Sequence, residues 1–154
     1  MSIKEFCKSK VVGTTFHDVP WDQIRVGDQL DLVREPNNKY DKYAIAVLWR
    51  GHHLGYIRAT EPDTFNGKWY PSLNRELSVS MAGTDYHFAI VCEITGGTEL
   101  KPNKGLNIRI MRQPLDHIKL RTYVCECGTI YYIPSWNTNV PECFKCRTMM
   151  EVSE

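Results

Sequence analysis

Four cysteines near the end of the chain constrain its fold more than any other feature. Cys125 and Cys127 form one pair, Cys143 and Cys146 form a second, and fifteen residues separate the pairs. Two thiolates from each of two tight turns complete a closed tetrahedral site at ~2.3 Å per bond, which is the geometry of structural zinc. A segment of about forty residues buries too little apolar surface to fold unaided, so we expect a metal ion to supply its folding energy.

Disulfides and unpaired thiols are the alternative interpretations of these cysteines. The N-terminus lacks the apolar run of a signal peptide, which favours a reducing compartment and hence metal binding. The first pair is Cys-x-Cys, which is tighter than the usual Cys-x₂-Cys, and Gly128 after it is expected to supply unusual backbone angles. With the short strand expected at 129–134, the segment looks like a zinc ribbon that holds one structural ion per chain. Four thiolates leave no open position for catalytic water.

Composition bounds the rest of the chain. At 154 residues with 42% apolar residues, it is long enough for one domain with a real core and a small appendage. The net charge is +1, so any nucleic-acid site must be a local basic and aromatic patch. No apolar run approaches the ~20 residues of a membrane span, and no membrane partner is expected. We expect an intracellular protein, cytoplasmic or, in a eukaryote, nuclear.

The residues before the cysteines predict a mainly β domain. Short alternating apolar segments are separated by Gly, Pro and Asn turns, a pattern typical of a barrel or sandwich. Strands are expected at residues 11–16, 29–34, 43–49, 54–58, 77–82, 88–95 and 106–111, with a tight hairpin at 50–53. Residues 60–63 resemble a helix start, so one or two short helices are expected before Leu77. Residues 96–105 are either a hairpin tip or a linker. The Gln113-Pro114 punctuation predicts two domains, 1–114 and 115–154.

The loop at residues 34–43 is the strongest candidate for a binding site. Pro36 and Asn37 begin a turn, and an alternating strand follows. Tyr40, Asp41 and Lys42 form a cluster of aromatic, acid and base where the loop becomes strand. Loops held by a rigid strand often carry binding residues, although a solvated hairpin turn is the simpler interpretation.

Three stretches resemble the HIRAN family in order and spacing: Val11-Val12-Gly13, residues 31–47, and His53-Leu54-Gly55-Tyr56-Ile57. The resemblance covers roughly residues 10 to 112 and is dense only from 11 to 57. This module occurs at the N-terminus of some Snf-type DNA translocases and alone in phage and bacterial proteins. The resemblance implies an OB-like β-barrel that grips single-stranded DNA, with a preference for a free 3′ end.

Each family position that contacts the DNA end can be compared with the matching residue of this chain. The resemblance implies that Phe16 stacks on a base and that Tyr40 and Asp41 match an aromatic residue and an acid of the family. Asp41 would then accept a hydrogen bond from the terminal 3′ hydroxyl. At the preceding basic position Thr15 lacks the charge to hold a phosphate.

The next motif departs further from the family pattern. Tyr56 stands where family members often carry histidine. Ala59 stands where they carry a basic residue, and the neighbouring Arg58 can supply the missing charge. Other candidate DNA contacts are Arg34, Lys39 and Lys42, which flank the Asp41 loop, and Tyr86 in the later loop at 83–87. The missing charges at Thr15 and Ala59 are expected to affect the affinity for DNA more than the geometry of the site, because phosphate contacts dominate nucleic-acid affinity.

Two further hypotheses stay open. The barrel can have lost DNA binding and serve as a protein-interaction or inhibitor module, of phage or bacterial origin, that docks a replication, repair or defence protein. A nuclease built on surface acids is the third hypothesis. No Gly-rich phosphate loop, Gly-x-Ser-x-Gly or His-Glu-x-x-His motif occurs in the sequence, so we expect no catalytic activity.

Overall fold

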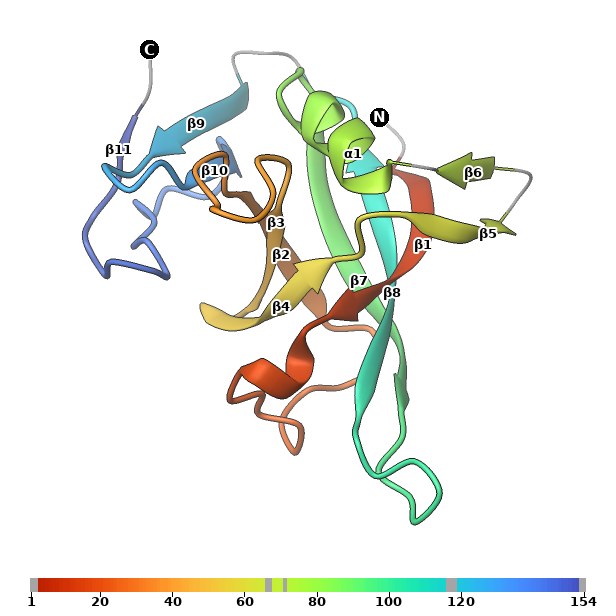
Figure 1. The fold of residues 1–154 in the computed structure, drawn as a ribbon. Coiled ribbons are helices and arrows are strands. Elements are labelled where there is room, and N and C mark those ends of the chain that lie inside the picture. Colours follow the sequence, from red (N-terminus) through yellow and green to blue (C-terminus); the bar gives the residue numbers. More distant parts are fainter. Residues whose placement is uncertain (1–2, 66–67, 71, 116–118, 153–154) are drawn as a thin grey trace.

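The computed structural model of the chain describes residues 3–65, 68–70, 72–115 and 119–152, with the backbone alone for the strands between 61 and 70. Six antiparallel strands form a closed barrel (Figure 1). They are β1 (Lys4–Val12), β2 (Gln29–Arg34), β3 (Ile45–Trp49), β4 (His52–Ile57), β7 (Tyr86–Thr95) and β8 (Gly105–Gln113). Their order is β2-β3-β4-β1-β8-β7, and the additional pairing of β2 with β7 closes the sheet. The prediction of a mainly β, barrel-forming chain is confirmed.

Alternation along the strands decides which side chains fill the barrel. On β2, Leu30 and Leu32 point inward and are buried. Strand β3 is buried along its whole length, and its residues divide between two hydrophobic clusters. Val47 belongs to the cluster inside the barrel, whereas Leu48 belongs to a second cluster under the C-terminal segment. A strand covered on both faces explains the unbroken apolar run in this part of the sequence.

Helix α1 (Leu73–Met81) lies where a strand was predicted, so the strand expected at 77–82 is wrong. Leu77 and Met81 are four residues apart and both are buried, while Val79 between them is 68% exposed. Such spacing fits one face of a helix as well as it fits a strand, and packing of that face into the barrel core decides the outcome.

The helix expected to start at 60–63 is also wrong. This segment forms β5 (Glu61–Phe65), which pairs with β6 (Lys68–Tyr70) in a separate two-stranded sheet (Figure 1). Among the described residues α1 is the one α-helix, and it is neither long nor apolar enough to cross a membrane.

Turns differ from the predictions at two further points. The first strand ends at Val12 and not at Phe16, because Gly13 adopts a left-handed conformation (φ 79°) that starts the 3₁₀ turn η1 (Thr14–Phe16). The hairpin between β3 and β4 turns on Arg50 and Gly51 alone, both with positive φ. Residues 96–104 form the tip of the long β7–β8 hairpin, and Gly105 begins β8 (Figure 1).

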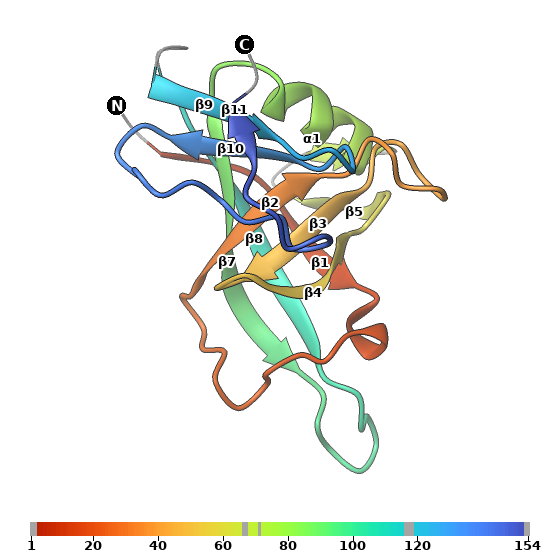
Figure 2. The ribbon, with the colours of Figure 1, turned by 90° about the vertical axis from the view of Figure 1, so that its left-hand side faces the viewer.

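The C-terminal segment packs on the outside of the barrel. It contains β9 (Leu120–Val124), β10 (Ile130–Pro134) and β11 (Glu151–Val152), which Figure 2 shows over β2 and β3. Ile130 pairs with Arg34, so β10 extends the barrel sheet beyond β2. Tyr123 and Met150 from the segment share the second hydrophobic cluster with Leu48 of the barrel. The division into domains 1–114 and 115–154 stays a prediction.

Candidate nucleic-acid interface and cysteine cluster

The loop between β2 and β3 is held by its own hydrogen bonds. Oδ1 of Asn38 accepts from the backbone N–H groups of Tyr40 (2.9 Å) and Asp41 (3.1 Å). At the base of the loop, the N–H of Glu35 donates to the carbonyl of Ala44 at 3.0 Å. The asparagine side chain therefore fixes the backbone of both residues that the sequence singled out, as expected for an Asx turn.

Asp41 connects this loop to helix α1. Its Oδ1 accepts from the N–H of Tyr43 at 2.8 Å, and its Oδ2 accepts from the side-chain amide of Asn74. Asn74 is buried in the first turn of α1, and its own N–H donates to the carbonyl of Ala59 at 3.4 Å. These bonds orient the carboxylate, and each oxygen keeps a lone pair for a further donor. No local sequence pattern points to Asn74, which lies 33 positions from its partner.

Phe16 and Tyr40 are the most exposed aromatic side chains among the described residues, at 86% and 85%. Phe16 ends η1, and the ring of the next residue, His17, lies 6.3 Å from the ring of Tyr56. Tyr56 is half-buried on β4, where burial and the Glu35 carboxylate raise the pKa of its hydroxyl. The turn after β1, the end of β4 and the 35–44 loop thus share one face of the barrel.

Basic side chains surround the Asp41 loop. The Lys39 Nζ lies 4.9 Å from the ring centre of Tyr40, and the Lys42 Nζ lies 5.2 Å from that of Tyr43. Arg75 of α1 approaches the same Tyr43 ring, with its guanidinium carbon at 5.8 Å. Arg75 was not predicted as a site residue, because only the helix brings it to this loop.

Arg34 and Arg58 flank the loop. Arg34, at the end of β2, donates to the Tyr132 hydroxyl at 2.9 Å and so contacts the C-terminal segment. Arg58 directly follows β4 and precedes Ala59, whose carbonyl contacts Asn74. The structure thus brings Arg58 close to the Asp41 loop, whereas Thr15 and Ala59 leave two positions without charge.

Tyr86 lies away from the other candidates. Its hydroxyl accepts from Gln29 Nε2 at 3.2 Å, and its ring is 6.2 Å from that of Trp136, beyond the end of β10. The 35–44 loop lies near the beginning of β10, where Ile130 pairs with Arg34. The structure therefore does not bring Tyr86 together with the face that carries Tyr40.

His53 lies on β4 with its side chain half-buried, although the sequence predicted a tight hairpin at 50–53. Its ring lies 4.0 Å from that of His17 and 4.7 Å from that of Phe144, with Tyr56 at 4.9 Å. Burial, followed by the charge of His17, lowers the pKa of His53 to about 4. The four-ring cluster joins η1, β4 and the C-terminal segment, so the second cysteine turn borders the candidate DNA face.

The four C-terminal cysteines converge as their spacing predicts. Their Sγ atoms all lie within 4.8 Å of one another, and all four are free thiols. The Cys127–Cys143 and Cys127–Cys146 sulfur separations are 3.6 and 4.0 Å. Four thiolates bound tetrahedrally at ~2.3 Å per bond would lie about 3.8 Å apart. The Cys125–Cys146 separation of 2.9 Å is shorter than this, and the four thiols together are close enough to hold one metal ion.

Each cysteine pair sits on a turn closed by backbone hydrogen bonds. The N–H of Gly128 donates to the carbonyl of Cys125 at 2.8 Å, and the N–H of Arg147 donates to that of Cys143 at 2.8 Å. Gly128 (φ 94°) and Arg147 (φ 58°) both take left-handed conformations. At Gly128 a Cβ atom would lie 2.2 Å from the Asn37 side chain, so close approach to the barrel loop also requires glycine.

Two threonine hydroxyls lie beside the sulfurs. Oγ1 of Thr129 is 3.1 Å from Sγ of Cys127, and Oγ1 of Thr148 is 3.2 Å from Sγ of Cys146. Hydrogen bonds from the Cys125 thiol and then from Thr148 lower the pKa of Cys146 to about 6. Donors of this kind stabilise thiolates and orient metal ligands.

Part of the chain is similar to a known family and to solved structures. Residues 4–62 match the family model of the HIRAN domain. A solved structure of a protein from Lactobacillus plantarum is similar, with 24% identity and a TM-score of 0.55, over 74% of this chain and 98% of that one. The HIRAN domain of human HLTF is 18% identical, with a TM-score of 0.47, over 69% of this chain and 74% of that one. Among curated proteins the comparison finds no match. The chain therefore contains a HIRAN domain, followed by a C-terminal segment whose cysteine cluster is compatible with a zinc ribbon.

Proposed function

We propose that the protein is a non-enzymatic single-stranded DNA-binding protein that recognises free 3′-hydroxyl ends. The HIRAN match supports a DNA-binding role. The observation that carries the proposal is the placement of Asp41, whose carboxylate is fixed on the same loop that exposes 85% of Tyr40. Phe16 offers a second exposed ring on the same face.

The chemistry of a carboxylate selects an end over a continuous strand. A carboxylate repels phosphate, so an acid in a DNA groove is costly unless it accepts a hydrogen bond, either from a base amino group or from a hydroxyl. In DNA only the strand terminus offers that hydroxyl. The bonds from Tyr43 and Asn74 hold the Asp41 carboxylate in one orientation, which lowers the cost of ordering it on binding.

Stacking and phosphate contacts supply the affinity. Tyr40 and Phe16 stack on the last bases, at ~1–3 kcal/mol per base, and Tyr56 lines the wall between them. Lys39, Lys42 and Arg75 surround the loop, and Arg58 and Arg34 extend the basic edge on either side. These side chains line the phosphate backbone and replace the charge missing at Thr15 and Ala59. Binding then weakens as salt rises, because neutralised phosphates release counterions.

The cysteine cluster holds one structural zinc ion in this proposal. Cys125, Cys127, Cys143 and Cys146 are its four ligands, so no position stays open for substrate or water. The ion supplies folding energy to the C-terminal segment, which contacts the DNA-binding loop.

The test compares oligonucleotides that end in a 3′ hydroxyl with the same strands carrying a 3′ phosphate, by fluorescence anisotropy. The wild-type protein should bind the hydroxyl end more tightly, and Asp41→Asn should remove that difference. Asn74→Ala is the matched control, because it releases the loop from α1 and keeps the carboxylate. Asn74→Ala should bind both oligonucleotides more weakly and still prefer the 3′ hydroxyl. This result would show that Asp41 recognises the hydroxyl and that Asn74 only positions the loop. Equal affinity of the wild-type protein for both ends would refute end recognition.

A protein-interaction module is the second candidate function. Its support is the lack of charge at Thr15 and Ala59, together with the C-terminal segment beside the DNA face, where Phe144 contacts His53. A replication, repair or defence protein would then be the partner. Absence of oligonucleotide binding at low salt would favour this function over the first.

A further inference from the structure

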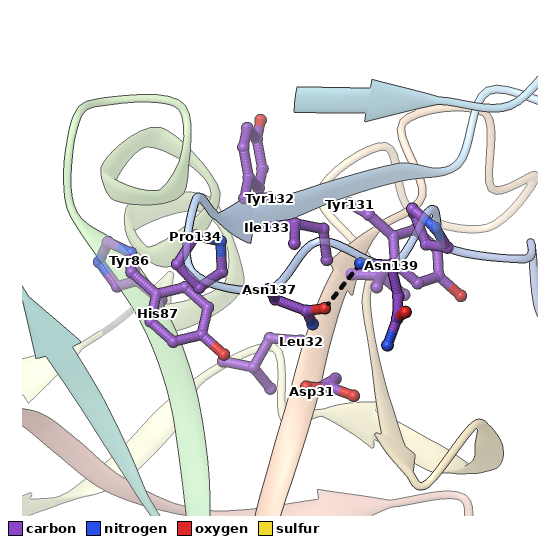
Figure 3. A pocket seen from close by; sticks show the side chains of 12 residues that line it. Asp31, Leu32, Tyr86, His87, Tyr131, Tyr132, Ile133, Pro134, Asn137 and Asn139 are labelled. Carbon is purple, nitrogen blue, oxygen red and sulfur yellow. Dashed lines mark hydrogen bonds between the residues drawn. The ribbon is translucent and has the colours of Figure 1, made fainter. Parts of the chain in front are cut away.

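Two adjoining cavities form a groove where β2 and β7 meet the segment that follows β10. Their volumes are about 150 Å³ and about 460 Å³, and the smaller one is the more enclosed. Both are lined by Asp31, Tyr86, Pro134 and Asn137. Figure 3 shows the side chains of Asp31, Tyr86 and Asn137 extending toward one another from three different parts of the chain.

Strand alternation places an acid beside aromatic rings. Because Leu30 and Leu32 fill the barrel, Asp31 between them faces outward. Asp31 pairs with Phe88 across the β2–β7 ladder. The ring of Tyr86 stacks on that of Phe88 at 5.4 Å and meets the ring of Trp136 edge-on at 6.2 Å. The groove therefore combines one carboxylate with aromatic rings from both sides of the junction.

The charge of the groove is negative. Among its described lining residues Asp31 is the only carboxyl group, and burial raises its pKa, a shift that a bound cation would offset. Burial lowers the pKa of His87 to about 4, so its ring is neutral at pH 7. Within the described part of the chain, the Asp31 carboxylate has no hydrogen-bond or ion-pair partner. Ring faces carry negative electrostatic potential, so carboxylate and rings together attract a cation.

A guanidinium group matches this groove better than other cations. It is planar, stacks on aromatic faces and donates two parallel N–H groups to one carboxylate. The cavity of about 460 Å³, which Asp31, Tyr86 and Trp136 line together, has ample room for this head group. A nucleotide fits poorly, because no Lys or Arg lines the described groove to neutralise its phosphate.

We propose that this groove binds an arginine side chain of a partner protein, with the guanidinium paired with Asp31 and stacked against Tyr86 and Trp136. The site is independent of the proposed DNA face. Asp31 and Tyr86 lie toward the Pro134 end of β10, and the Asp41 loop lies toward its Ile130 end. A protein bound here would leave Phe16 and Tyr40 open to DNA.

The test titrates the full chain with an acetyl-Gly-Arg-Gly-amide peptide and follows backbone amide signals by NMR. The control peptide carries citrulline, the neutral isostere of arginine. Signals of Asp31, Tyr86 and Asn137 should shift with the arginine peptide, and citrulline should bind at least roughly tenfold more weakly, because charge-assisted pairs are about twice as strong as neutral ones. Equal binding of both peptides, or no shift at these residues, would overturn the proposal.

Variants locate the binding to the groove. Asp31→Asn should weaken arginine binding roughly tenfold and remove the preference over citrulline, since the isosteric amide carries no charge. Asp18→Asn, an exposed acid after η1, is the matched control and should change neither. Trp136→Ala alters an exposed ring outside the core and should also weaken the arginine peptide. Unchanged binding in both Asp31→Asn and Trp136→Ala would overturn the site. Loss of oligonucleotide binding in Asp31→Asn would instead make the groove part of the DNA surface.

Discussion

Lys145 and Glu35 form an ion pair that joins the cysteine cluster to the barrel, with the Lys145 Nζ 2.8 Å from the Glu35 Oε1. The Glu35 side chain is 1% exposed and the Lys145 side chain 41%. Lys145 stands between Cys143 and Cys146, while Glu35 begins the loop that carries Asp41. The pair therefore links the second cysteine turn directly to the loop that carries Asp41.

Removing Lys145 from this pair should lower the free energy of unfolding more than removing the charge of Glu35. Lys145→Met leaves the buried Glu35 carboxylate without its cation, at about 1–3 kcal/mol, the usual cost of an unsatisfied buried polar group. Glu35→Gln leaves a lysine that can turn toward solvent, so its effect should be smaller. The double variant should recover part of the loss, because no uncompensated charge remains.

Urea unfolding of the four proteins measures this cycle. Arg121→Met, on the exposed part of β9, is a control for removing a basic residue of the C-terminal segment. Additive losses in the double variant would contradict the coupling.

Zinc should be present at one ion per chain after purification under reducing conditions without chelator. Cys143→Ser removes a buried ligand, so the protein should lose the ion and the order of β9–β11, while the barrel stays largely folded. Elemental analysis and NMR measure the two effects. Cys92→Ser, a half-buried thiol outside the cluster, should retain the metal. A wild-type protein without zinc would show that the cluster has another role.

Local patterns predicted much of this fold. The bounds of β2 were predicted correctly, and the cysteine spacing located the cluster, because both depend on nearby residues. Segment 77–82 was assigned wrongly because its apolar positions fit two periods, and only the barrel core selects the helix.

The contacts that complete the candidate site depend on the tertiary fold. Asn74 reaches Asp41 across 33 positions and Lys145 reaches Glu35 across 110. Neither partner carries a local sequence signal, since each acquires its position from a different element. Arg75 likewise joins the basic cluster only through the first turn of α1.

Stability should fall as the pH drops from about 6.5 toward 4. Burial lowers the pKa of His87 from 6.5 to about 4, so the folded state favours the neutral imidazole. In the unfolded chain His87 takes up a proton at a higher pH than in the folded protein. The contribution of neutral His87 to stability is therefore complete above pH 6.5 and is lost as the pH approaches 4. The shift corresponds to at most about 3 kcal/mol.

Chemical denaturation at several pH values tests this dependence. His87→Gln keeps polar atoms near Ser80, whose hydroxyl lies 2.7 Å from Nε2 in the wild type. It should reduce the pH dependence, to which His53, with a pKa also lowered to about 4, still contributes. Acid release of the metal affects both proteins, so the difference between their slopes isolates His87. Parallel slopes would assign the acid sensitivity to other groups.

Replacing the exposed rings should weaken DNA binding without loss of stability. Phe16 and Tyr40 are more than four-fifths exposed, so Phe16→Ala and Tyr40→Ala remove almost no packing in the free protein. Each should cost about 1–3 kcal/mol of binding to single-stranded DNA, the contribution of one stacked base. Leu100→Ala, at the fully exposed tip of the β7–β8 hairpin, is the matched control and should bind as the wild type does.

The dependence on salt separates stacking from charge in the same experiment. Lys39→Ala and Lys42→Ala should each lower the slope of log affinity against log salt, by about 0.7 for every phosphate of a single strand that the variant no longer neutralises. Phe16→Ala should lower affinity at every salt concentration and leave the slope unchanged, because a ring releases no counterions. A slope change in Phe16→Ala, or full affinity in both ring variants, would place the DNA on another face of the barrel.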